Sequence, residues 1–114
     1  MNAFRALLVA IILCVGAYTA VTIADHGLNL LPVFFGDMAE MAWPGQFNLD
    51  FMCFLLLSGL WLAWRHEFSP AGIALGVGGV LLGAPYLALY LLITSFRVQG
   101  DVRALLLGEA RAAA

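Results

Sequence analysis

The chain contains 114 residues, of which 64% are apolar and 11% are charged, with a formal net charge of −2. A water-soluble domain usually carries about 25% charged residues, and the mean hydropathy of +1.00 agrees with a lipid environment. The composition excludes an ordinary soluble domain and predicts an integral membrane protein with the lipid bilayer as a partner. Lysine is absent and the arginines form no basic run, which argues against nucleic acid as a partner.

The first apolar segment covers residues 4–24. A helix needs about 20 residues to cross ~30 Å of hydrocarbon at ~1.5 Å per residue. Arg5 and the triplet Thr22-Ile23-Ala24 resemble parts of a secretory signal peptide, but the run is longer than the ~7–15 residues of its apolar region. We therefore expect a retained membrane-spanning helix.

Small and polar side chains recur every four residues on one face of this first segment, at Cys14, Tyr18 and Thr22. The second cysteine, Cys53, also lies inside an apolar run, and no CxxC spacing occurs. Both cysteines are expected to be packing residues, so neither a disulfide nor a zinc site is predicted.

The long link at residues 25–50 is the most polar part of the chain. Residues 33–43 fit an amphipathic helix with an aromatic side and an acidic side, which predicts a short helix lying in the membrane interface. The sequence Trp43-Pro44-Gly45 is expected to end this helix with an interfacial aromatic and a turn.

A second span is predicted at residues 47–65, with Asn48 as its N-cap and Asp50 in its first turn. His66 follows in a short turn and is expected to be a surface residue. The third span is predicted at residues 70–96; it is longer than the bilayer requires and would tilt, kink or protrude.

These segments predict an all-α fold: a three-helix membrane bundle forming one domain over residues 1–114, with a surface helical tail after residue 97. Strands are excluded because the apolar runs are continuous and three strands cannot close a barrel. The first loop, at residues 25–46, has no basic residue, which favours a cytoplasmic N-terminus.

The third segment carries the most regular pattern in the sequence. Four glycines recur at spacings of four, three and four residues and share one helix face: Gly72, Gly76, Gly79 and Gly83. Small residues at this spacing let another helix approach closely in lipid. We therefore predict a helix-packing face, followed by a kink at Pro85.

In a three-span topology, the end of the first span, the start of the second and the end of the third reach the same membrane side. A polar cluster is therefore expected there, formed by Asp25, His26, Asn48, Asp50, Tyr86, Tyr90, Thr94 and Arg97. Two interpretations stay open: hydrated helix ends joined by an ion pair of Arg97 with Asp25 or Asp50, or a pocket for a ligand. No metal-ligand spacing is present, and no metal site is predicted.

Several short stretches resemble a family of small, uncharacterised bacterial membrane proteins with three hydrophobic segments. These stretches are Asp25-His26-Gly27-Leu28, Phe47-Asn48-Leu49-Asp50, Trp61 to Arg65, Gly83-Ala84-Pro85 and Leu89-Tyr90-Leu91. The resemblance covers most of the chain after residue 20. It implies a multi-pass protein of the bacterial inner membrane and no catalytic residue.

Three functions are compatible with these patterns. The first is a non-catalytic accessory or assembly subunit of a larger respiratory, photosynthetic or transport complex, held to other subunits or to a second copy through the glycine face. The alternative is a small membrane enzyme or binder of a quinone, isoprenoid or lipid, with Asp50, Asp25 or His26 as its acid or base. A transporter or channel subunit is less favoured because charges at mid-membrane and inverted repeats are missing. No cofactor is predicted, although a quinone or lipid could bind.

Overall fold

The computed structural model describes all 114 residues, and every element is a helix. The helices are α1 (Asn2–His26), α2 (Leu30–Ala39), α3 (Trp43–Arg65), α4 (Pro70–Leu82), α5 (Ala84–Arg97), α6 (Val102–Leu107) and α7 (Glu109–Ala113). Two of them, α1 and α3, are long and apolar enough to cross a membrane. The all-helical prediction is therefore confirmed.

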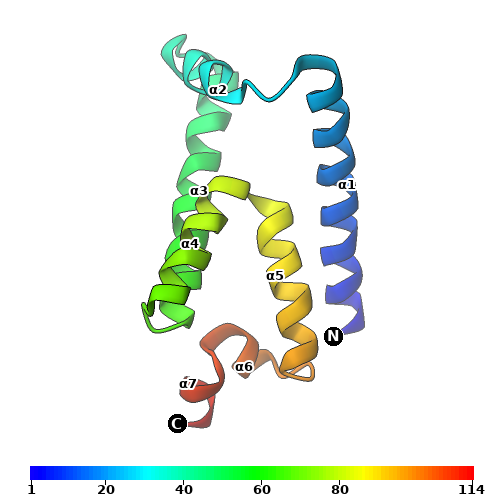
Figure 1. Ribbon diagram of the computed structural model, residues 1–114, viewed down its shortest axis with the longest axis vertical. Helices are drawn as coiled ribbons and strands as arrows, with labels where there is room; N and C mark the ends of the chain where they lie inside the picture. The colour runs from blue at the N-terminus through cyan, green and yellow to red at the C-terminus, as the bar shows by residue number, and fades with distance from the viewer.

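Helices α1, α2 and α3 form an arch (Figure 1). α1 runs up one side of the molecule from the N-terminus, α2 crosses the far end, and α3 returns toward the end that carries the N-terminus. α2 is fixed to the start of α3 by Asn48, whose Nδ2 donates to the Phe34 carbonyl at 3.1 Å and to Asp37 Oδ2 at 3.4 Å. Gly45 allows this contact, because a Cβ there would collide with the Asp37 carbonyl oxygen.

The expected boundary between the interfacial helix and the second span is wrong. α2 ends at Ala39, and α3 already begins at Trp43, so Asn48 lies inside α3 rather than at its N-cap. Pro44 stands in the first turn of α3. A proline starts a helix well because its missing N–H would have no helical partner there. The tripeptide Trp43-Pro44-Gly45 therefore begins a helix instead of ending one.

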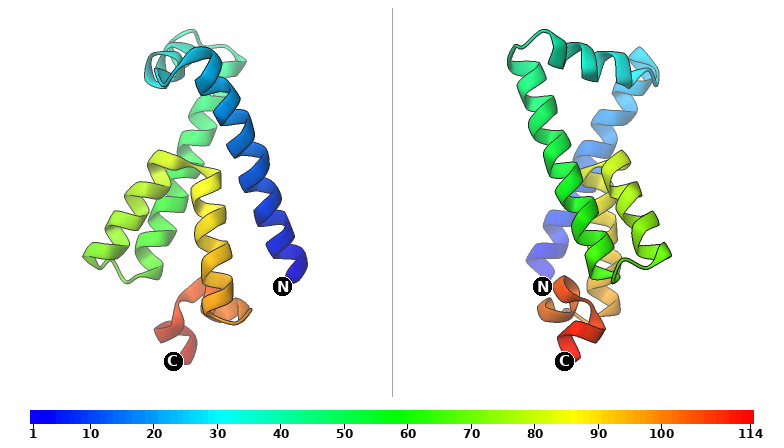
Figure 2. Two further views of the ribbon diagram at one scale, coloured as in Figure 1. Left: turned by 45° about the vertical axis from the view of Figure 1, so that its right-hand side comes forward. Right: turned by 90° about the vertical axis from the view of Figure 1, so that its left-hand side faces the viewer.

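The single third span predicted at residues 70–96 is also wrong. Gly83 has φ of 75° and ends α4, and α5 then begins with Pro85 in its first turn. The chain reverses at this point, so that α4 and α5 form a hairpin (Figures 1 and 2). With 13 and 14 residues, each arm is ~20 Å long, short of the ~30 Å of a bilayer core.

The closest helix packing joins α3 to α4. A Cβ at Gly76 would lie 2.6 Å from the Gly59 carbonyl oxygen, and one at Gly59 would lie 2.7 Å from the Gly76 carbonyl oxygen. Gly72 and Gly79 extend the contact on both sides, and Leu62 beside them is completely buried. The glycine face thus lies against α3 of the same chain. Gly83 also lies against α3, but it forms the turn of the hairpin rather than part of a helix.

The second arm, α5, packs against the first half of α1. Arg5 joins them: its Nε donates to Ser95 Oγ and its Nη2 to the Ser95 carbonyl, both at 3.0 Å. The guanidinium also lies 3.9 Å from the centre of the Phe96 ring. α5 begins near mid-length of α1 and runs toward its N-terminus, so the second half of α1 packs against no other helix, and Leu8 is the only buried residue of α1.

Replacing Gly76 by alanine tests the α3–α4 contact. The new Cβ would meet backbone atoms of Gly59, which cannot rotate away, so the helices must separate. We expect a loss of about 1–3 kcal/mol in unfolding free energy, measured by chemical denaturation in detergent micelles. Gly16→Ala is the matched control because nothing lies within 4 Å of its Cβ position. Equal denaturation midpoints for the two variants would contradict the contact.

Candidate functional site

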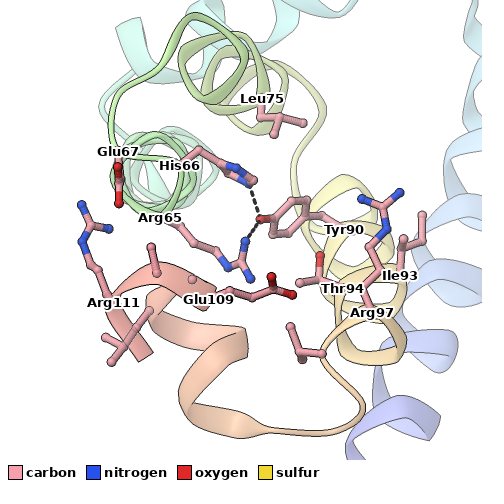
Figure 3. A pocket seen from close by; sticks show the side chains of 14 residues that line it. Arg65, His66, Glu67, Leu75, Tyr90, Ile93, Thr94, Arg97, Glu109 and Arg111 are labelled. Atoms are coloured by element: carbon pink, nitrogen blue, oxygen red, sulfur yellow. Dashed lines mark hydrogen bonds between the residues drawn. The ribbon is translucent and has the colours of Figure 1, made fainter. Parts of the chain in front are cut away.

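A pocket of about 580 Å³ lies where the end of α3, both arms of the hairpin and the tail meet (Figure 3). It is at the end of the molecule that carries the N-terminus. Its polar lining comes from Arg65, His66, Glu67, Tyr90, Thr94, Arg97, Glu109 and Arg111. Its apolar lining comes from Leu75, Ile93, Val98, Leu107 and Ala110. No other part of the molecule gathers as many charged side chains around one space.

Tyr90 is at the centre of the hydrogen bonds in this pocket. Its hydroxyl oxygen lies 2.9 Å from Arg65 Nη1 and 2.6 Å from His66 Nε2 (Figure 3). A guanidinium can only donate, so Arg65 donates to the phenol oxygen. The phenol proton is then free to be donated to His66 Nε2 when the neutral imidazole carries its proton at Nδ1.

Arg65 also holds the tail against α3. Its Nε donates to the Leu105 carbonyl at 2.7 Å and its Nη2 to the Ala104 carbonyl at 3.0 Å. Trp61 Nε1 donates to the next carbonyl, that of Leu106, at 3.1 Å. These carbonyls lie in the last turn of α6, where a helix leaves carbonyls without helical partners. That of Ala104 also accepts the N–H of Gly108 at 3.0 Å.

The last helix, α7, is held by an arginine of its own that donates to α3. Arg111 Nη1 donates to the carbonyl of Trp64 at the end of α3, and its guanidinium lies 4.0 Å from the centre of the Trp64 ring. Gly108 makes the turn between α6 and α7 with φ of 88°, and a Cβ there would lie 3.0 Å from the Arg65 carbonyl oxygen. The expected surface tail is therefore docked on α3 and forms one wall of the pocket.

The pKa of His66 is lowered from its ordinary value of 6.5, first by burial and second by the positive charge of Arg65. Both effects disfavour the imidazolium. A lowered pKa of His66 agrees with the hydrogen bonds, because a protonated His66 would place a second donor, besides Arg65, against the Tyr90 hydroxyl.

The structure separates the polar cluster that the three-span topology predicted. Tyr90, Thr94 and Arg97 line the pocket at the N-terminal end. The other end carries the set of Asp25, His26, Asn48 and Asp50. An ion pair of Arg97 with Asp25 or Asp50 is therefore not formed. The physical reason is the reversal at Gly83, which returns the end of α5 to the side where α4 started.

Tyr86, the remaining residue of the predicted cluster, lies in neither of these two groups. Its hydroxyl donates to the Leu75 carbonyl at 2.9 Å and thus joins the two arms of the hairpin. Gly78 makes room for its ring, because a Cβ there would lie 2.6 Å from the hydroxyl oxygen.

The alternative catalytic residues Asp25, His26 and Asp50 are all exposed and lie outside the pocket. No group of three or more His, Cys, Asp or Glu side chains could hold a metal ion. The pocket residues that sequence reasoning missed are those of the α3–α4 turn and the tail, above all Arg65, His66 and Glu109. Gly83 with Pro85 two residues later was the available signal, because this pairing is typical of a helix end followed by a helix start.

No protein-family model matches the chain, and no curated protein or solved structure is detectably similar to it. The resemblance to small three-span bacterial membrane proteins therefore stays a prediction.

The lowered pKa of His66 predicts a pH dependence of stability. The unfolded chain binds a proton at His66 near pH 6.5, whereas the folded chain does so at lower pH. The contribution of neutral His66 is complete above pH 6.5 and is lost as the pH falls through the lowered pKa. We expect the melting temperature to fall between pH 7.5 and 5, measured by thermal unfolding in detergent. In His66→Gln the fall should be smaller; an unchanged fall would contradict the role of His66.

Proposed function

We propose that the chain is an integral membrane protein of the bacterial inner membrane, with α1 and α3 as spans and α4–α5 as a hairpin that enters and leaves on one side. Only 15 of 114 residues are buried. In the most apolar windows, 6% of α1 and 17% of α3 is buried. A core helix of a soluble protein would be mostly buried, so these apolar surfaces favour lipid or partner helices as their surroundings.

The tip of the hairpin fits this placement. Backbone groups that face hydrocarbon must be shielded by protein. Gly83 is buried at the tip, and a Cβ there would lie 3.2 Å from the Phe51 ring and 3.7 Å from Leu55, both on α3. The turn is thus covered by side chains of the second span.

Reporter fusions distinguish this topology from three straight spans. The hairpin returns the chain to its starting side, so we expect green fluorescent protein at the C-terminus to be fluorescent in the cytoplasm, with the N-terminus on the same side. Alkaline phosphatase fused after Leu28, in the α1–α2 link, should be active in the periplasm and serves as the control. A C-terminal phosphatase fusion as active as that at Leu28 would contradict the hairpin.

Within this membrane placement, the geometry best supports a non-catalytic accessory or assembly subunit of a larger complex. The observation that carries the proposal is that the second half of α1 packs against no other helix. Tyr18 there is 77% exposed and lies well inside the apolar helix, where a phenol hydroxyl needs a hydrogen-bond partner. Cys14 and Thr22 lie on the same face. Because the glycine face is already occupied by α3, this α1 face is the surface left for another subunit.

The catalytic alternative receives less support, because the proposed acids and bases are exposed and are not brought near Tyr90 or Arg97. An enzyme needs these groups within hydrogen-bond reach of one substrate.

Cross-linking from Cys14 tests the subunit proposal. In a Cys53→Ala background, a membrane-permeant bismaleimide applied to native membranes should join Cys14 to one protein of defined mass. The same protein should co-purify at fixed stoichiometry in mild detergent. Tyr18→Ala should reduce the recovered partner about tenfold, which corresponds to a loss of ~1.4 kcal/mol.

Leu13→Ala is the control, because Leu13 is also exposed, at 66%, but lies on another face of α1. A chain that stays monomeric in mild detergent by native mass spectrometry, with no product at Cys14, would contradict the proposal.

A further inference from the structure

The pocket contains charges of both signs that are not paired with each other. Arg97 and Glu109 both line it and are exposed. Figure 3 shows hydrogen bonds only around Tyr90. Glu109 extends from α7 toward Thr94, whereas the Arg97 side chain extends from α5 past Tyr90, away from Glu109. Two opposite charges that face one space without meeting leave room for a ligand that carries both.

The other arginines of the pocket are already engaged. Arg65 donates to Tyr90 and to two carbonyls of α6, and Arg111 donates to the Trp64 carbonyl and covers its ring. Arg97 is thus the guanidinium available to an anion, and Thr94 of the same helix also lines the pocket. Guanidinium binds phosphate oxygens through charge-assisted hydrogen bonds.

The apolar side of the pocket points to a ligand with chains. Leu75 of α4 and Ile93 of α5 line it, and Ile93 is 46% exposed. The two arms of the hairpin diverge away from the tip at Gly83 (Figures 1 and 2). In the proposed membrane placement, the space between the arms opens to lipid, whereas the charged residues lie at the interface.

We propose that this pocket binds the headgroup of a zwitterionic phospholipid with a primary ammonium group. Arg97 and Thr94 hold the phosphate, Glu109 holds the ammonium, and the acyl chains leave along Leu75 and Ile93. The volume of about 580 Å³ is sufficient for such a headgroup. The inference rests on the membrane placement proposed above, but not on the accessory-subunit role.

Lipid retention by the purified full-length chain tests the site. The protein is extracted in mild detergent, mixed with phosphatidylethanolamine, phosphatidylcholine or phosphatidylglycerol, and examined by native mass spectrometry. We expect phosphatidylethanolamine to be retained best. The choline headgroup has no N–H to donate to Glu109, and the glycerol headgroup has no cation.

Two variants separate the roles. Arg97→Gln should lower retention of phosphatidylethanolamine at least about tenfold, because a hydrogen bond to a charged group is lost, and Arg97→Lys should restore part of it. Glu109→Gln should remove the preference for ethanolamine over choline. Glu40→Gln, a substitution of another exposed glutamate outside the pocket, should behave as the unaltered protein. Helicity measured by circular dichroism shows that each variant is folded.

The outcomes are distinguishable. Equal retention of the three lipids, or unchanged retention in Arg97→Gln, would overturn the headgroup site. If glycerophosphoethanolamine, which has no acyl chains, binds as tightly as the lipid, the ligand is a soluble compound and the lipid assignment fails. A chain that does not fractionate with membranes would contradict the membrane placement itself, whereas the absence of a Cys14 cross-link bears only on the accessory-subunit role.

Discussion

The reversal of the chain at Gly83 is the constraint on which the arrangement of the site depends. Its φ of 75° is easily adopted only by glycine, and Pro85 two residues later cannot continue the preceding helix because it lacks an N–H. The two residues together divide a long apolar run into two arms that return to one end. A straight helix through the same residues would carry Tyr90, Thr94 and Arg97 to the opposite end of the molecule.

The hairpin is held in place by two contacts of different kinds. The first arm approaches α3 through Gly76 and Gly59, where backbone meets backbone and dispersion contacts accumulate. The second arm is held to α1 by Arg5, which bonds both oxygens of Ser95. Because the arms are attached to different spans, they diverge below the tip, and the pocket forms between them and the tail.

The tail completes this pocket by hydrogen bonds between helix ends. Short helices such as α6 leave their last carbonyls without partners, and the ridge of Trp61 and Arg65 on α3 supplies the donors. Arg65 joins α3 to both α6 and α5, because it also donates to Tyr90 on α5. Its loss would therefore release the tail and the phenol together. The site is rich in arginine, yet most of its donors are used to hold the fold, and Arg97 stays available for a ligand.

The sequence by itself determined that the chain is helical, which segments are apolar, and that glycines of the third segment form a close helix contact. These properties follow from composition and from the spacing of residues along one helix. It did not determine the direction of the chain after Leu82, since Gly83 and Pro85 are compatible with either a kinked helix or a reversal. It also did not show that Arg65 and His66 meet Tyr90, because that contact joins residues from different helices. Only the tertiary structure decided these points: the side on which Tyr90 lies depends on whether α4 and α5 find separate partners in α3 and α1.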